Sequence, residues 1–285
     1  MTTPSPTSAV RIQAPLKTVF HALTDPAEMR VWFAEHAEVD LPARYDFWGR
    51  HTLEGDAPHQ RVLEVSDDLI VFAWTLDGTE TTTEIRLTET DGETGPETLV
   101  AVTQSHFDRA LIFSGSASPL AALETFWALA LGNLADHVEG RKVGPRVDYT
   151  AKVSEFSATL DIDAPADRVR TALTDSDQAT SWFGYPIGIE PEVGGRFAMG
   201  GLEAAGDHAA RFVALDDTSA SIDWGGMVTS WELAGSGGRT TLTFVTSGFD
   251  AAQPPYAAWG GWLSGLVELR RYLEQPNWRS VFVQG

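Results

Sequence analysis

The chain has 285 residues, no cysteine, and 40 acidic against 20 basic side chains, which gives a formal net charge of −20. Without cysteine it has no disulfide, no thiol nucleophile and no thiolate metal site. The negative charge repels phosphate backbones and anionic membranes, so we expect no nucleic-acid partner. No apolar run reaches the roughly 20 residues that span a bilayer, and residues 1–8 lack the features of a signal peptide. We therefore expect an acidic cytoplasmic protein without membrane insertion.

One stretch of the chain occurs twice. The first copy, Ile12 to Phe33, contains Ala14-Pro15, then Ala-Leu-Thr-Asp at residues 22–25, and ends in Trp32-Phe33. The second copy runs from residue 162 to residue 183, so every landmark is displaced by 162 − 12 = 150 residues. This period indicates a duplicated domain, because solenoid repeats have periods of roughly 20–50 residues.

In the first repeat the pattern predicts a strand, two helices, six strands and a long closing helix. Proline is favourable in the first helical turn, and Thr24-Asp25-Pro26 ends one helix and caps the next. The Asp-Gly pairs at 77–78 and 91–92 are typical of hairpin turns. The predicted strands are 10–13, 37–40, 44–48, 61–65, 69–76, 81–88 and 97–106, and the apolar stripe of the closing helix is Leu120, Leu123, Trp127, Leu131, Leu134 and Val138.

The second repeat predicts the same order of elements. Its displacement from the first falls to 249 − 107 = 142 residues at Phe249, and to 262 − 127 = 135 residues at Trp262. Surface turns and loops tolerate such length changes, so the pattern indicates a duplication with surface deletions. The predicted strands are 156–163, 187–190, 195–199, 210–214, 219–224, 228–233 and 239–247, and the closing stripe is Trp259, Trp262, Leu266, Leu269 and Leu273.

These elements predict an α+β fold. Hairpin-linked strands imply an antiparallel sheet, and one long amphipathic helix must cover its apolar face. We therefore expect two domains, residues 1–147 and 148–285, each a curved antiparallel sheet around a long C-terminal helix. Gly140 to Val153, which contains Gly144-Pro145 and four basic residues, is the predicted linker.

The order Ala-Pro, Ala-Leu-Thr-Asp, Trp-Phe and a strand tryptophan, Trp74 or Trp224, resembles the SRPBCC (START-like, Bet v 1-like) superfamily. Within it the chain is most similar to the bacterial members of the AHSA1 branch, which is named after the activator of Hsp90 ATPase. The resemblance covers nearly the whole chain, in tandem. It implies helix-grip domains with an apolar cavity between sheet and helix, and a superfamily that binds lipids, sterols, polyketides and other hydrophobic ligands.

The aromatic residues are the candidate ligand contacts. Aromatic side chains also dominate packed cores, whereas a sheet that does not close tightly on its helix leaves apolar space for a ligand. Both interpretations stay open at this point. The candidate ligand-binding residues are Trp32, Trp48, Trp74, Phe107, Trp127, Trp182, Tyr185, Phe197, Trp224, Trp231, Phe249 and Trp262.

The second repeat is expected to be the more open of the two, because it carries several glycine pairs. One pair, Gly260-Gly261, lies inside the closing helix, where each glycine lowers helix stability by ~1 kcal/mol. The pair indicates either close helix packing or a flexible cavity mouth beside Pro254-Pro255-Tyr256.

The sequence contains no recognisable catalytic machinery. The seven histidines have no metal-ligand spacing, HExxH is absent, and we expect no metal and no cofactor. His51 and His59 flank a loop that we expect to be solvated. Glu35-His36 lies near the expected cavity rim, but the second repeat has Tyr185-Pro186 there, so the copies do not share acid–base chemistry.

Two arginines, Arg61 and Arg211, begin a central strand in each repeat. An arginine that faces inward could hold a ligand carboxylate, whereas an outward one would form a surface ion pair. We expect the outward arrangement.

Three functions fit these observations. The first is binding of a small hydrophobic molecule without catalysis, with one repeat keeping the pocket and the other serving as its packing partner. The second is a di-domain polyketide aromatase/cyclase, which inward Arg, His or Tyr groups in a cavity would favour. The third is an Hsp90-type co-chaperone or interaction protein, which the acidity disfavours because like charges oppose association.

Overall fold

The computed structural model describes residues 8–92, 95–106 and 116–283. The chain forms two compact units. Unit 1 comprises Met1–Ala151, Pro255–Ser264 and Val281–Gly285, and unit 2 comprises Lys152–Pro254 and Gly265–Ser280. The division of the chain at residues 147 and 148 stays a prediction.

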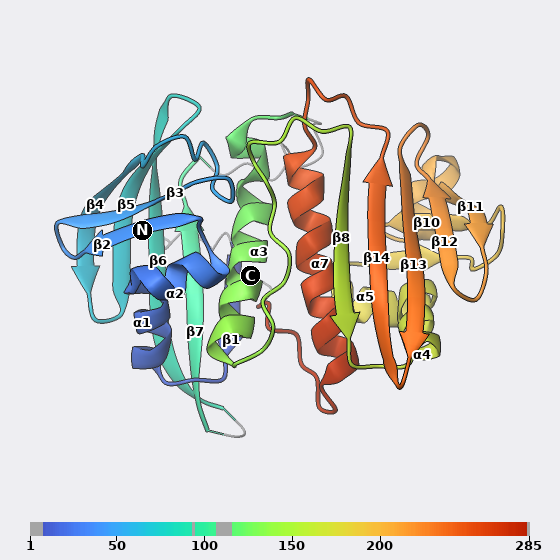
Figure 1. The fold of residues 1–285 in the computed structure, drawn as a ribbon, viewed down its shortest axis with the longest axis horizontal. Coiled ribbons are helices and arrows are strands. Elements are labelled where there is room, and N and C mark those ends of the chain that lie inside the picture. The colour runs from blue at the N-terminus through green and yellow to red at the C-terminus, as the bar shows by residue number, and fades with distance from the viewer. Residues whose placement is uncertain (1–7, 93–94, 107–115, 284–285) are drawn as a thin grey trace. The chain divides into compact units, whose positions relative to one another are not determined.

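The sheet of unit 1 is five-stranded and antiparallel, in the order β1-β7-β6-β5-β4, while β2 and β3 pair as a separate hairpin. Asp77 and Gly78 have φ of 51° and 69°, the left-handed values that a tight hairpin turn requires, so the predicted turn between β5 and β6 is confirmed. The elements of unit 1 are β1 (Ser8–Ile12), α1 (Leu16–Thr24), α2 (Pro26–Trp32), β2 (His36–Asp40), β3 (Arg44–Trp48), β4 (Gln60–Ser66), β5 (Leu69–Leu76), β6 (Thr79–Gly92), β7 (Gly95–Gln104) and α3 (Pro119–Val138) (Figure 1).

Unit 2 has a single seven-stranded antiparallel sheet in the order β8-β14-β13-β12-β11-β10-β9. A short helix, α6 (Leu202–Ala205), and a 3₁₀ turn, Gly206–His208, lie between β10 and β11 and were not predicted. The remaining elements of unit 2 are β8 (Glu155–Ile162), α4 (Ala166–Thr174), α5 (Ser176–Phe183), β9 (Ile187–Ile189), β10 (Arg196–Met199), β11 (Ala210–Leu215), β12 (Ser219–Asp223), β13 (Val228–Ser236) and β14 (Arg239–Ser247). The last helix, α7 (Tyr256–Glu274), is divided, because its residues up to Ser264 belong to unit 1 and those from Gly265 to unit 2. With curved antiparallel sheets and long C-terminal helices, the fold is the predicted α+β, helix-grip class.

The repeated Ala-Pro and Thr-Asp pairs hold equivalent elements in place. Thr98 Oγ1 in β7 donates to the Ala14 carbonyl at 2.8 Å, and Thr240 Oγ1 in β14 donates to the Ala164 carbonyl at 2.7 Å. Asp25 caps α2 by accepting from two backbone N–H groups, as expected for an N-cap aspartate. These side chains therefore fix the start of the helical segment against the sheet.

The C-terminal segment returns to the first strand of unit 1. The backbone N–H of Arg11 donates to the Val281 carbonyl at 2.8 Å, and that of Val283 donates to the Ala9 carbonyl at 2.9 Å. The side chain of Val281 is buried, with 4% of its surface exposed. Residues far apart in the sequence thus share the β1 edge of this sheet, which the repeat pattern did not predict.

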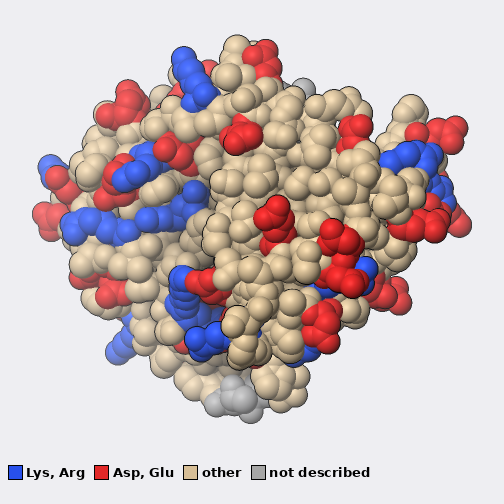
Figure 2. Space-filling view, turned by 45° about the vertical axis from the view of Figure 1, so that its right-hand side comes forward, with Lys and Arg blue, Asp and Glu red and all other residues tan. Residues whose placement is uncertain are grey.

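The surface carries charges of both signs. On the face seen in Figure 2, acidic and basic side chains are dispersed among uncharged surface rather than gathered into one large patch of a single sign. In the described part of the chain, no helix is long and apolar enough to cross a membrane.

Candidate functional site

The tryptophan of each opening stretch is tied to the helix before it. Trp32 Nε1 donates to the Ala22 carbonyl at 3.0 Å, and Trp182 Nε1 donates to the Ala172 carbonyl at 2.8 Å. Both rings are buried, with 2% and 5% exposed. A buried indole N–H needs an acceptor, and the last turn of α1 or α4 supplies it. The repeated Ala-Leu-Thr-Asp and Trp-Phe motifs thus form one packing unit.

Unit 1 closes its sheet with a continuous aromatic cluster. The Trp74 ring lies 5.3 Å from Phe47, 5.5 Å from Phe126 and 6.3 Å from Trp127, measured between ring centroids. Phe33 joins the same cluster, 4.8 Å from Phe47. Trp74 has no exposed surface and Trp127 has 1%. In this conformation a ligand reaches these two candidates only if the cluster opens.

A buried polar group lies beside the cluster. Gln104 Oε1 accepts from Thr83 Oγ1 at 2.8 Å and from Trp127 Nε1 at 3.3 Å, and Gln104 Nε2 donates to Thr81 Oγ1 at 2.9 Å. Trp74 Nε1 is buried without a hydrogen-bond partner in the described residues. The hydrogen bonds of Gln104 make the contact between α3 and the sheet specific, because buried polar groups need matched partners.

Trp48, another candidate of the first repeat, lies apart from this cluster. Trp48 is half-buried and packs on His36 at a centroid distance of 5.2 Å. Phe107 lies outside the described residues. Neither can be placed at a cavity shared with Trp74.

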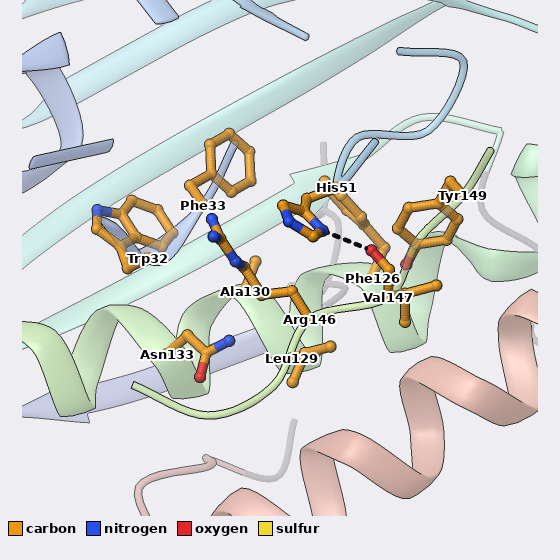
Figure 3. A pocket seen from close by; sticks show the side chains of 10 residues that line it. All are labelled: Trp32, Phe33, His51, Phe126, Leu129, Ala130, Asn133, Arg146, Val147 and Tyr149. Atoms are coloured by element: carbon orange, nitrogen blue, oxygen red, sulfur yellow. Dashed lines mark hydrogen bonds between the residues drawn. The ribbon is translucent and has the colours of Figure 1, made fainter. Parts of the chain in front are cut away.

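A small cavity in unit 1 borders the aromatic cluster and has one candidate ligand-binding residue, Trp32, in its lining. Its volume is about 20 Å³, enough for a single water-sized group by the criterion of roughly 10–15 Å³ per water. Figure 3 shows the side chains around it, which come from α2, the loop after β3, α3 and the segment after α3. The lining residues are Trp32, Phe33, His51, Phe126, Leu129, Ala130, Asn133, Arg146, Val147 and Tyr149.

His51 corrects the expectation of a solvated loop. Its side chain is half-buried, and Nδ1 lies 2.8 Å from the Val147 carbonyl oxygen (Figure 3). Burial lowers the pKa of His51, since charging a desolvated imidazole is unfavourable, and the nearby Arg146 lowers it further. The neutral His51 ring therefore donates a hydrogen bond from Nδ1 to the Val147 carbonyl oxygen. His59 does remain at the surface, with Nε2 3.0 Å from Asp56 Oδ1.

The predicted linker is packed onto unit 1. Tyr149 N donates to the Arg50 carbonyl at 2.7 Å, and its ring lies 5.9 Å from Phe126. The side chain of Val147 is 1% exposed. The alternating apolar residues Val147 and Tyr149 were the sequence signal for this packing, but the glycine, proline and charges around them favoured a free linker.

Glu35 is an ionised anchor and not an acid–base group. Arg50 N donates to Glu35 Oε2 at 3.1 Å, and Arg50 Nη2 to Glu35 Oε1 at 2.7 Å. These backbone and side-chain hydrogen bonds lower the pKa of Glu35, since they favour the charged form. The pair holds the loop that carries His51.

The two retained arginines face outward. Arg61 Nη2 lies 3.1 Å from Glu80 Oε2, and both side chains are more than half exposed, which confirms the predicted surface ion pair. Arg211 Nη1 is also at the surface but donates to the Gly194 carbonyl at 2.9 Å. Its partner is therefore backbone and not a carboxylate.

In unit 2 the candidates fall into a connected group and isolated members. Phe197 lies 5.5 Å from Trp224 and 6.2 Å from Phe212, which in turn lies 6.3 Å from Trp231. Trp231 is buried, whereas Trp224 is half-buried and donates from Nε1 to Thr229 Oγ1 at 3.0 Å. These rings therefore connect β10 and β11 with Trp224, which directly follows β12, and with Trp231 inside β13.

The remaining candidates of the second repeat lie elsewhere. Tyr185 follows α5 and is 49% exposed. Phe249 stacks on Phe156 of β8 at 5.7 Å, at the sheet edge opposite β9. Trp262 is a half-buried residue of the part of α7 that clusters with unit 1. The ligand contacts proposed from sequence thus do not converge on one place.

The glycines of α7 serve close packing. A Cβ on Gly260 would lie 2.9 Å from Thr125 Oγ1, within unit 1, and a Cβ on Gly265 would lie 2.8 Å from the Phe183 ring, within unit 2. Glycine permits this approach because it has no side chain. Of the two interpretations left open by the sequence, the contacts favour close packing.

The two modules have the architecture of helix-grip proteins, and comparison with known families agrees. The model of the family described as "Activator of Hsp90 ATPase homolog 1-like protein" (AHSA1) matches residues 13–139 and 163–274. The chain belongs to this family, in tandem. A sequence comparison found no matching curated protein.

Several solved structures are distantly similar to this chain. A conserved protein of unknown function from Enterococcus faecalis is 22% identical over 45% of this chain and 75% of its own, with a TM-score of 0.38. An Hsp90 activator from Plasmodium falciparum is 18% identical over 34% and 74%, with a TM-score of 0.30. DynU16, from the dynemicin biosynthetic locus, is 15% identical over 93% and 96%, with a TM-score of 0.36. No activity follows from these likenesses.

Proposed function

We propose that the protein binds a small hydrophobic molecule in unit 2, while unit 1 serves as a closed module. The observation that carries the proposal is the contrast between Trp74 and Trp224, which hold matching positions of the sequence repeat, 224 − 74 = 150 residues apart. Trp74 is fully buried under aromatic rings, whereas Trp224 is only half-buried. Apolar surface of this kind favours association with an apolar ligand.

Neighbouring side chains in unit 2 support the proposal. Phe197 forms an edge-to-face contact with Trp224, with an angle of 76° between the rings. Met227, whose carbonyl accepts from Trp224 N at 2.8 Å, is 38% exposed. The indole N–H is satisfied by Thr229, so the rest of the Trp224 ring is apolar.

Unit 1 fits the role of the closed module. Opening unit 1 would separate Trp74 from Phe126 and Trp127 and expose large apolar surfaces to water. The free-energy cost of this exposure is roughly 25 cal/mol per Å² of apolar surface. It would also break the hydrogen bond of Trp127 to Gln104. We infer that the candidate contacts Trp32, Trp74 and Trp127 stabilise the fold of unit 1 and do not contact a ligand. We also infer that the protein acts in the cytoplasm.

The aromatase/cyclase alternative has one observation in its favour. The cavity in unit 1 is lined by a histidine, an arginine and a tyrosine, which are the group types that such chemistry needs. Its volume of about 20 Å³ is far below the roughly 300 Å³ at which small-molecule pockets begin. This function therefore ranks second.

The test is a direct binding measurement. Native mass spectrometry of protein purified from its own host should reveal a bound apolar molecule, and calorimetric titration with fatty acids and planar aromatic compounds should identify the chemical class. Trp224→Ala should weaken binding by about tenfold, because losing an aromatic contact costs roughly 0.5–1.5 kcal/mol beyond the lost area.

Trp48→Ala is the matched control, since Trp48 is a half-buried tryptophan of unit 1 and should leave affinity unchanged. An equal loss in both variants would contradict a site in unit 2. Absence of any apolar ligand or response would leave the interaction-protein alternative.

A further inference from the structure

The cavity in unit 1 contains hydrogen-bond donors without acceptors. Asn133 is completely buried, and its Oδ1 accepts from Gly144 N at 2.9 Å, which assigns the other amide atom as Nδ2. Within the described residues, neither Asn133 Nδ2 nor Tyr149 Oη has a hydrogen-bond partner, although both atoms are buried. Burial raises the pKa of Tyr149, so its hydroxyl remains a donor. Buried donors normally find a partner, and both groups line this one cavity.

A cation lines the same cavity. Arg146 is half-buried, and its Nη1 contacts the carbonyl oxygens of Arg30 at 3.3 Å and Ala34 at 3.5 Å. No carboxylate of the described residues forms an ion pair with Arg146, and the nearby Glu35 is engaged with Arg50. Burial and the Arg50 charge lower the pKa of Arg146. A partly desolvated charge with no ionic partner favours binding of a counter-ion.

The cavity therefore combines the features that an anion requires. We infer that it is a binding site for a small carboxylate, with one oxygen held by the Asn133 amide and the Arg146 guanidinium. Figure 3 shows Asn133 and the Arg146 guanidinium on one side of this space and Tyr149 on the other side, beside Val147 and Phe126. The volume of about 20 Å³ suits one oxygen atom by the size of a water. The neutral His51 ring does not contact the carboxylate in this arrangement. It holds the segment that carries Arg146 through its hydrogen bond to the Val147 carbonyl.

The site is assembled by the segment between the repeats. Arg146 and Tyr149 belong to it, while Asn133 belongs to α3. Binding of a carboxylate therefore stabilises the docking of this segment on unit 1, because a ligand favours the state that holds it. The site is separate from the hydrophobic site proposed for unit 2 and does not depend on it.

The probe is sodium acetate, titrated into the full chain labelled with ¹⁵N, with sodium chloride as the comparison at constant ionic strength. The side-chain amide signals of Asn133, identified by their loss in Asn133→Asp, should shift progressively and saturate with acetate. An equal response to chloride would overturn the carboxylate assignment. No response to acetate would show that the cavity holds an ordered water only.

Charge variants test the role of Arg146. Arg146→Gln should weaken acetate binding by about tenfold or more, since a charge-assisted hydrogen bond is lost. Lys142→Gln is the matched control, because it removes the same charge from the same segment at an exposed position outside the cavity lining. Equal weakening in both variants would show nonspecific attraction and overturn the proposal.

A third variant separates binding from folding. Asn133→Asp retains an acceptor for Gly144 and places a carboxylate beside Arg146, so it should abolish acetate binding in a chain that still unfolds cooperatively. Retained acetate affinity in folded Asn133→Asp would overturn the site. Should this variant not fold, the Arg146 and Lys142 pair decides the question on its own.

Discussion

The substitution Gly265→Ala tests how closely α7 approaches α5 in unit 2. A Cβ at this position would lie 2.8 Å from Cε2 and 3.0 Å from Cδ2 of Phe183, and 3.4 Å from Cζ3 of Trp182. Carbon atoms in van der Waals contact are ~3.5–4.0 Å apart, so the Phe183 ring must move. The Trp182 ring behind it is held by its hydrogen bond to the Ala172 carbonyl.

Two opposing effects set the expected magnitude. Replacing glycine by alanine inside a helix stabilises it by roughly 0.5–1 kcal/mol. Overpacking of a filled core costs roughly 1–3 kcal/mol. Gly265→Ala should therefore lower the free energy of unfolding by about 0–2 kcal/mol. Gly261→Ala is the control on the same helix, because its nearest contact is Thr125 Cγ2 at 3.4 Å. Gly261→Ala should therefore raise the free energy of unfolding by roughly 0.5–1 kcal/mol.

The assay is equilibrium unfolding in urea, followed by far-UV circular dichroism and by tryptophan fluorescence. If the units unfold separately, the transition that contains the Trp182 signal is the relevant one. Gly265→Ala should unfold at a lower urea concentration than Gly261→Ala. Equal stabilisation in the two variants would refute the close approach of Phe183 to α7.

Two further predictions concern the C-terminal segment and an acidic turn. Ending the chain after Ser280 removes the buried Val281 and two backbone hydrogen bonds to β1. This truncation should destabilise unit 1 by about 2–5 kcal/mol. An unchanged melting temperature would mean that the C-terminal segment does not pair with β1. Hydrogen bonds from Thr218 N and the Ser219 hydroxyl lower the pKa of Asp216 from 3.8 to about 2, so its stabilising effect is present above about pH 4 and is lost as the pH falls towards 2. Asp216→Asn should flatten this part of the stability–pH profile, and a profile parallel to that of the unmodified chain would count against the proposed hydrogen bonds.

Local signals predicted the elements closely. Asp25 caps α2 where the Thr-Asp-Pro motif indicated, and β5 spans Leu69–Leu76 as predicted. These features depend on residues a few positions apart, whose capping and turn preferences act within the segment itself. The missed helix α6 is four residues long and begins after Gly201, too short to show a helical period.

The candidate site was less accessible to sequence reasoning. The aromatic residues were found, but whether a tryptophan is covered, like Trp74, or half-buried, like Trp224, depends on rings contributed by distant segments. The proposed carboxylate site was missed because Asn133 lies in α3 and Arg146 in the segment after it, and the two residues share no motif. Only their approach in space defines the chemistry.

The sequence by itself determined that the chain carries two copies of one α+β module, because the displaced landmarks, caps and hairpin turns are local and repeat in order. Only the tertiary structure decided how each copy uses that module. In the folded chain Gly265 packs against Phe183, the segment of Val281 pairs with β1, and the Tyr149 ring lies against Phe126. These are contacts between residues distant in sequence, and burial and close packing in three dimensions select them.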